Sequence, residues 1–186
     1  EDWDCRLQLH GQGSDIVQCA WSPDDAMLAT CSMDNSVAVW RLPEGLATSS
    51  AAGRGGMGTL APLRRLVGHE SWVRGVTWDP VGRYLATASD DGSVIVWRAE
   101  EDWGIEARVT APFAGCDTGT HTRRVDWSPD GKCICATNAR QKAMLLTRGS
   151  WEFQVNLVGH AATPSIARYS PALYYREGTA ASSSSA

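Results

Sequence analysis

The feature that most constrains how this chain can fold is the stretch 68–98, which reads GHESWVRGVTWDPVGRYLATASDDGSVIVWR. It opens on a Gly-His pair, and an aromatic residue followed by Asp and Pro comes nine residues after the His. An apolar segment then runs into an acidic turn, and an alternating strand closes on a Trp that stands six residues after an Asp. Apolar segments separated by polar turns predict short β-strands. The rest of the chain can be placed by asking where this layout recurs.

The layout recurs upstream, over residues 11–40. A WSPDD motif takes the place of the central Trp-Asp-Pro motif, and Asp34 stands six residues before Trp40. One position differs, because Gln12 rather than a His comes nine residues before the WSPDD motif. The upstream segment is therefore a second copy of the same unit with one altered polar site.

The layout recurs downstream in a degenerate form, over residues 118–158. Its centre is the motif WSPDG at 127–131, and apolar alternation survives in the segments that follow. The positions that hold the His, the Asp and the Trp of the central repeat hold other residues here, namely Thr118, Arg140 and Leu146. A further Gly-His pair at 159–160 is followed nine residues later by Tyr-Ser-Pro, which begins another copy.

Units with a Gly-His pair at one end and a Trp at the other are WD repeats, and each forms one four-stranded blade of a β-propeller. We therefore predict an all-β WD-repeat β-propeller with about three complete blades and two partial ones. The repeats span about 11–67, 68–113 and 118–158, and the start of another lies at 159. Closed propellers have about four to eight blades. We expect these blades to be a fragment of a larger ring, which we take to be seven-bladed.

We place the propeller at residues 1–175, and three further segments of the chain have their own character. The alternating stretch Trp3–Leu9 predicts the outer strand of a blade whose earlier part is absent. Residues 43–61 are rich in Gly, Ala and Ser without periodicity, which predicts a flexible insertion between two strands of one blade. The low-complexity stretch at 176–186 predicts a disordered tail.

Composition argues against several classes of function. The formal net charge of −4 offers no clustered basic face for a nucleic-acid backbone, and no apolar run reaches the length of a membrane-spanning helix. The six cysteines include no Cys-x-x-Cys pair and the four histidines lie far apart, so we expect no metal site and no cofactor. Cys19 and Cys31 lie in apolar segments, where free cysteines act as small buried hydrophobic residues. This usage fits a reducing compartment.

The polar residues of the repeat have spacings that suit a hydrogen-bonded network inside a blade. We expect the Asp91 carboxylate to accept from the His69 ring and the ring to bond the Thr87 hydroxyl. That hydroxyl would then meet the indole N–H of Trp97. The first repeat offers the same set without the His, namely Thr30, Asp34 and Trp40. Because an unpaired polar group in a buried site costs about 1–3 kcal/mol, such a network fixes the register of its blade.

The same residues also allow an enzymatic interpretation. A His–Asp pair can act as a general base, and the acidic pairs Asp24-Asp25 and Asp90-Asp91 could serve as metal ligands or catalytic carboxylates. The repeated spacing favours the structural role for the His–Asp pair, and the turn residues after each acidic pair favour solvated turns. The sequence contains no nucleophile elbow, phosphate loop or zinc-binding helix motif. We therefore predict a protein that is not an enzyme and has no catalytic residue.

Longer runs of the chain resemble one WD-repeat family in particular. The run SWVRGVTWDPVGRYLATASDDGSVIVWR at 71–98 resembles the WD-repeat domain of the HIRA/Hir family of histone chaperones. The resemblance extends upstream through 20–40, and downstream through the motifs EDW, APF, RRVDWSPDG, RGSW and LVGH. It includes the degenerate repeat, which an unrelated WD protein would not share. Gln12, the insertion at 43–61 and the residues past Tyr175 depart from the family pattern.

The resemblance implies a function through protein binding. HIRA-type proteins are nuclear scaffolds of a complex that deposits histones independently of DNA replication, and their propeller docks a ubinuclein-type subunit. By this resemblance the chain would be a nuclear, non-enzymatic scaffold that acts in nucleosome assembly, chromatin organisation and transcriptional regulation, including repression. Its partners would be the ubinuclein-type subunit, the other subunits of the chaperone complex and, indirectly, histones. We expect no sequence-specific contact to nucleic acid and no contact to a membrane.

Within this function we expect the partner surface on the degenerate repeat, around Arg123, Arg124 and Asp126. Arg124 stands where the other repeats have Gln18 and Gly75, and its planar guanidinium with five donors suits a partner's carboxylate or backbone. An exposed arginine without a role is the plain alternative. Two other functions also fit the repeats, namely the middle subunit of chromatin assembly factor 1, which is replication-coupled, and a general WD-repeat adaptor such as a ubiquitin-ligase substrate receptor.

Overall fold

The computed structural model describes residues 5, 7–43, 58–100, 102–113, 124–138, 142–159, 164 and 166–170. The first blade consists of β2 (Ile16–Trp21), β3 (Met27–Ser32), β4 (Ser36–Arg41) and β6 (Arg64–Val67). The second consists of β7 (Val73–Trp78), β8 (Tyr84–Ser89), β9 (Val94–Arg98) and β10 (Ile105–Val109), followed by a short 3-10 helix, η1 (Ala111–Phe113). The third consists of β11 (Val125–Trp127), β12 (Cys133–Asn138), β13 (Lys142–Thr147) and β14 (Phe153–Val158).

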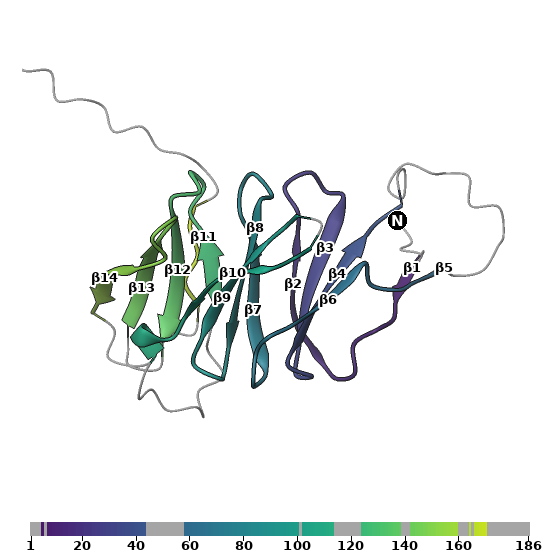
Figure 1. The fold of residues 1–186 in the computed structure, drawn as a ribbon, viewed down its shortest axis with the longest axis horizontal. Helices are drawn as coiled ribbons and strands as arrows, with labels where there is room; N and C mark the ends of the chain where they lie inside the picture. The colour runs from purple at the N-terminus through teal and green to yellow at the C-terminus, as the bar shows by residue number, and fades with distance from the viewer. Residues whose placement is uncertain are drawn as a thin grey trace, which may run out of the picture.

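Each blade is a four-stranded antiparallel sheet in which the strands pair in the order in which they occur along the chain. The second sheet has the order β10-β9-β8-β7, with the same consecutive pairing. Figure 1 shows the three sheets side by side, with β7 of the second blade next to the first blade and β11 of the third next to the second. The predicted all-β fold of WD-repeat propeller blades is confirmed.

Equivalent positions in the blades have the same local geometry. The innermost strands of the first two blades both contain a register shift near their start, between Ile16 and Gln18 in one and between Val73 and Gly75 in the other. The turn after this strand holds one residue with a positive φ in every blade, namely Asp25 (57°), Gly82 (74°) and Gly131 (68°). Glycine is favoured at this point because it adopts a left-handed backbone without a steric cost.

The apolar core lies mainly between neighbouring blades. One cluster joins the first two blades, and its fully buried members include Val37, Val39, Val76, Leu85 and Ile95. A second cluster joins the second and third blades, and its fully buried members include Val94, Ile134, Met144 and Leu146. Burying a side chain of this size contributes about 1.5–3 kcal/mol, so the contact between blades is the main source of stability for each blade.

The side chain of Trp78 lies in the interface between the first and second blades. Its side chain is nearly buried, and its indole N–H donates across the interface to the Ala20 carbonyl oxygen of the first blade at 3.0 Å. The equivalent residue of the first blade, Trp21, is 53% exposed. Cys19 on the same strand is also exposed, although an apolar segment predicted its burial, whereas Cys31 is buried as expected.

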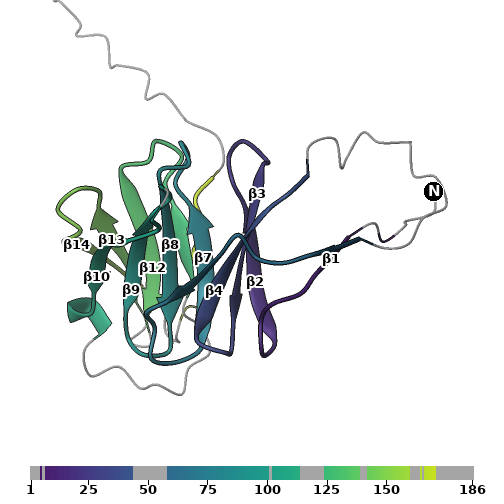
Figure 2. The ribbon, with the colours of Figure 1, turned by 45° about the vertical axis from the view of Figure 1, so that its right-hand side comes forward.

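One prediction at the edge of the first blade was wrong. The stretch Trp3–Leu9 was expected to be the outer strand of a blade, but its described part, β1 (Leu7–Leu9), pairs with β5 (Gly58–Leu60) in a parallel two-stranded sheet. This sheet lies to one side of the blades (Figure 2). Residues 58–60 also belong to the segment 43–61 that was expected to be a flexible insertion, and 44–57 lie outside the described residues. The pairing joins segments far apart in the sequence, which local composition does not reveal.

The degenerate repeat folds as a complete blade. Leu146, which stands where the central repeat has Trp97, is fully buried between the second and third blades. Residues 166–170 have no regular secondary structure, but the backbone N–H of Tyr169 donates to the Asp126 carboxylate of this blade at 2.7 Å. The predicted tail at 176–186 and two of the substituted positions, Thr118 and Arg140, lie outside the described residues.

Candidate partner-binding site

The polar network of the second blade joins four side chains from separate parts of the repeat. Nδ1 of His69 lies 2.9 Å from Oδ2 of Asp91, and Nε2 lies 2.8 Å from the Thr87 hydroxyl. The indole N–H of Trp97 donates to the same hydroxyl at 2.9 Å. The His69 side chain is only 1% exposed, so both ring nitrogens have their partners inside the blade and neither faces a cleft.

Asp91 closes the turn between β8 and β9. Its carboxylate accepts from the backbone N–H of Glu70 at 2.9 Å, and from the backbone N–H and hydroxyl of Ser93 at 2.8 and 2.7 Å. Burial alone would raise the pKa of Asp91, but the hydrogen bonds and charge of His69, with those from Glu70 and Ser93, outweigh it and hold the pKa well below its ordinary value. The group is therefore an ionised structural carboxylate.

The first blade builds the same network around a glutamine. The Thr30 hydroxyl accepts from the Trp40 indole N–H at 2.9 Å and donates to Oε1 of Gln12 at 2.6 Å, while the Gln12 amide donates to the Thr30 carbonyl at 3.2 Å. Asp34 takes a different partner, because Nη2 of Arg65 lies 2.7 Å from its Oδ2. The Gln in place of the His therefore preserves the link to the threonine, and an outer-strand arginine takes over the link to the aspartate.

The third blade has a different anchor, which joins it to the second blade. The Arg148 guanidinium, in the turn between β13 and β14, forms two bonds to the Asp79 carboxylate, at 3.0 Å from Nη1 and 3.3 Å from Nη2. The same guanidinium lies 5.1 Å from the ring centroid of Tyr84 and 5.7 Å from that of Trp127. Trp151 packs edge-on against both of these rings. The ion pair and the aromatic cluster thus attach the degenerate blade to its neighbour.

One acidic turn is less solvated than the sequence suggested. Asp90 is buried, and its Oδ2 accepts from Nε of Arg74 at 2.8 Å. Arg74 also lies over the ring of Trp72, 4.7 Å from the centroid. The prediction of a solvated Asp90-Asp91 turn was therefore wrong, because both carboxylate side chains are only 6% exposed and each has a partner inside the blade. Asp24, in contrast, is exposed, and a hydrogen bond from Ser22 helps to lower its pKa.

Arg124 lies where the first strands of three blades meet. Its Nη1 donates to Oε1 of Gln18 in the first blade at 2.9 Å and to the Arg74 carbonyl oxygen in the second blade. Its backbone N–H donates to the Thr137 hydroxyl of its own blade at 3.1 Å. The half-buried guanidinium retains N–H groups on Nε and Nη2 that have no acceptor among the described residues. One side of the guanidinium therefore ties the blades together, and its Nε and Nη2 donors have no partner among the described residues.

The other two residues expected at this site differ from Arg124. Asp126 is engaged within the chain, because it accepts from Tyr169 and lies 3.7 Å from Nη1 of Arg168. Arg123 lies outside the described residues. Arg124 thus lies just before the first strand of the third blade, and Asp126 lies within that strand. The two side chains bind different partners.

The described residues offer no second type of site. Across those ranges, no group of three or more His, Cys, Asp and Glu side chains is arranged to hold a metal ion. A membrane-spanning helix, with the length and apolar character that this requires, is likewise absent from the described part of the chain. Burial raises the pKa of Cys31 to about 12 and that of Cys135 to about 11, so these buried thiols remain protonated near neutral pH.

Comparison with known proteins agrees with this geometry. The family model described as WD domain, G-beta repeat matches residues 3–41 and 60–98. The chain is 38% identical over 182 residues to Protein HIR1 of Cryptococcus neoformans var. neoformans, a match that covers 96% of this chain and 19% of that protein. It is 34% identical to Protein hir1 of Schizosaccharomyces pombe, over 94% of this chain and 17% of that protein. It is also 34% identical to Protein HIR1 of Yarrowia lipolytica, over 97% and 17%.

The blades and their repeated network define a WD-repeat β-propeller protein. The chain spans about a fifth of the length of these relatives, and the matches extend through the degenerate third blade. It carries a WD-repeat domain of the HIRA/Hir family, as the resemblance implied.

Proposed function

We propose that this domain is a non-enzymatic, protein-binding scaffold in a nuclear histone chaperone complex. Its role would lie in replication-independent nucleosome assembly, in chromatin organisation and in transcriptional regulation, including repression. The chain's membership of the HIRA/Hir family supports this proposal, because the resemblance to that family implies this function. The partner would be the ubinuclein-type subunit, with histones and the other subunits reached through the complex.

The observation that carries the proposal is that the Arg124 guanidinium uses only some of its N–H donors within the chain. Two of its five N–H groups are occupied by acceptors in the first and second blades. The N–H groups on Nε and Nη2 suit a carboxylate or backbone carbonyl of a partner. Because the bonded side is held by two blades, the free donors are presented in a fixed orientation, which lowers the entropic cost of binding.

The buried hydrogen bonds of His69 and Asp91 also favour a scaffold over an enzyme. His69 and Asp91 could act as a general base only if the ring could reach a substrate. Its side chain is 1% exposed, and it has partners at both nitrogens. The network therefore supports blade stability, and function would depend on surfaces rather than on these groups.

The test compares two substitutions that affect the same junction in different ways. Arg124→Ala removes both the link between blades and the free donors, whereas Gln18→Ala removes one link and leaves the free donors in place. Affinity for the ubinuclein-type subunit is measured by calorimetry, and thermal unfolding is recorded for both variants. We expect Arg124→Ala to weaken binding about tenfold or more and Gln18→Ala to leave it nearly unchanged.

Two outcomes would contradict the proposal. Undiminished binding by Arg124→Ala would exclude a contact between Arg124 and the partner. An equal loss of binding in Gln18→Ala would show that Arg124 acts through blade packing and not through direct contact.

A further inference from the structure

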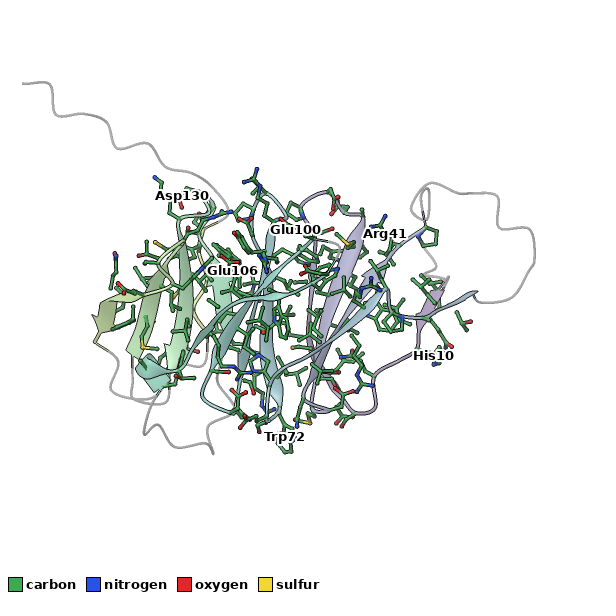
Figure 3. All side chains as sticks on the ribbon, viewed as in Figure 1. His10, Arg41, Trp72, Glu100, Glu106 and Asp130 are labelled. Atoms are coloured by element: carbon green, nitrogen blue, oxygen red, sulfur yellow. The ribbon has the colours of Figure 1, made fainter. Side chains whose placement is uncertain are left out.

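The carboxylate closest to Arg124 along the chain is that of Asp126. Arg124 directly precedes β11, at the end of the blades where Figure 3 shows Trp72, and the turn after β11 holds Asp130 at the opposite end. The Arg124 carbonyl accepts from the Thr137 N–H at 3.1 Å and so continues the ladder between β11 and β12. Because side chains alternate along a strand, Arg124 and Asp126 face the same side, with Cα atoms about 6.6–6.8 Å apart.

The Asp126 carboxylate is held by groups other than Arg124. Its Oδ2 accepts from the backbone N–H of Tyr169 at 2.7 Å. Its Oδ1 accepts from the Thr77 hydroxyl at 3.5 Å and lies 3.7 Å from Nη1 of Arg168, whose side chain is 53% exposed. An exposed ion pair contributes little, whereas a short bond from an N–H group to a carboxylate is strong. The Tyr169 N–H is therefore the main contact that holds Asp126.

The other carboxylate near the Arg124 contacts is already paired. Arg74, whose carbonyl oxygen accepts from Arg124, binds Oδ2 of Asp90 through its own guanidinium at 2.8 Å. Both side chains of this pair are only 6% exposed. Such a pair keeps its partners, because an unpaired buried charge is costly. Release of Asp126 is therefore the change that would bring a carboxylate to the free donors of Arg124.

We propose that Tyr169 and Arg168 keep the Nε and Nη2 donors of Arg124 available by holding the Asp126 carboxylate away from them. Once released, this carboxylate binds those donors, because an acceptor on the same strand is present at a high effective concentration. A partner must then displace it, and the apparent affinity falls in proportion to the fraction of molecules whose donors are free. Asp126 is thus a positioning residue of the site, in an inference that rests on the function proposed above.

The groups that hold Asp126 belong to the following repeat. Tyr169-Ser170-Pro171 matches the Trp-Ser-Pro motifs at 21–23 and 127–129, which close the first strands of the first and third blades. Binding at Arg124 therefore depends on whether the first part of the next repeat is docked against the third blade. This dependence couples the partner site to the neighbouring repeat.

The test uses two substitutions of one residue. Tyr169→Pro removes the N–H that binds Asp126, and the matched control Tyr169→Ala keeps that N–H and removes the ring. Heteronuclear NMR follows the Nε–H signal of Arg124, assigned by its absence in Arg124→Lys, and needs no partner. If nine-tenths of the molecules form the new bond, exchange of this proton with water slows about tenfold. We expect this slowing in Tyr169→Pro, no such change in Tyr169→Ala, and its reversal when Asp126→Ala is added to Tyr169→Pro.

The second measurement is the affinity for the ubinuclein-type subunit by calorimetry. Tyr169→Pro should lose about tenfold in affinity, and adding Asp126→Ala should restore it. Asp126→Ala alone should bind as the parent protein does.

Three results would overturn the proposal. The first is an Arg124 Nε–H that exchanges as fast in Tyr169→Pro as in the parent protein. The second is a loss of affinity that Asp126→Ala does not restore. The third is a loss in Asp126→Ala alone, since Asp126 would then contact the partner itself. If Arg124→Ala binds the subunit undiminished, the function proposed above fails, and the exchange of the Arg124 proton still decides whether Tyr169 controls its donors.

Discussion

The ion pair between Arg148 and Asp79 should decide whether the third blade stays docked to the second. We consider Arg148→Met, which keeps most of the apolar stem over the aromatic rings and removes the charge. The Asp79 side chain is 0% exposed and the Arg148 side chain 29% exposed. Without its partner the carboxylate would keep the backbone N–H of Arg83, at 3.1 Å, but no countercharge.

The magnitude follows from the burial of the carboxylate. Removing one partner of a buried ion pair costs about 3–5 kcal/mol, because an uncompensated charge remains. The partial exposure of Arg148 places the expected loss near the lower end, at about 3 kcal/mol. With a urea dependence of about 2 kcal/mol per molar, the unfolding midpoint should fall by about 1.5 M. Tryptophan fluorescence can follow the transition, since Trp127 and Trp151 lie beside the pair.

A double-mutant cycle separates this cause from a general loss of packing. In the Arg148→Met background, Asp79→Asn should recover part of the stability, because it removes the buried charge. We expect a coupling free energy of at least about 1.5 kcal/mol. Costs that add to within about 0.5 kcal/mol would refute the reasoning. The exposed pair of Lys132 with Asp130, at 3.3 Å, is the control, and Lys132→Met should change stability by less than about 0.5 kcal/mol.

Three further predictions concern the blade network and the cysteines. Thr87→Val should lower the free energy of unfolding by about 2–3 kcal/mol, because the Trp97 indole N–H loses its acceptor inside the blade; a loss below about 0.5 kcal/mol in urea unfolding would contradict this. Since folding lowers the pKa of Asp91, its contribution is complete above the unfolded pKa of about 4 and is lost as pH falls further. Asp91→Asn should therefore flatten the fall of the unfolding midpoint below about pH 4, and an unaltered pH profile would argue against the assignment. Iodoacetamide at neutral pH should modify exposed Cys19 before buried Cys31, whose pKa is raised to about 12, as peptide mass spectrometry can check.

The features that were predictable from the sequence are local to one repeat. The residues of the second-blade network lie within the stretch 68–98, and their order reflects three strands joined by tight turns. Because side chains alternate along a strand, the register of a hairpin decides which side chains meet. The spacing of His69, Thr87 and Trp97 therefore contains enough information to anticipate the contacts that the structure shows.

The features that were not predictable depend on contacts between elements far apart in the sequence. Nothing in the spacing of Asp79 and Arg148 joins them, although they pair across an interface between blades. Asp90 was expected in a solvated turn, and only the tertiary structure shows its carboxylate buried against Arg74. The role of Arg124 as a link between three blades was missed for the same reason.

The amino-acid pattern is sufficient to specify the class of fold, the three repeats that form blades and the network within the second blade. All of these follow from alternation and turn chemistry over short distances. The tertiary structure alone decides how one sheet faces the next. That arrangement determines which side of Arg124 is occupied and why Cys19 is exposed when Cys31 is buried. The physical reason is that blade packing brings together side chains from turns and strands of different repeats. The distance between these side chains along the sequence follows no regular spacing.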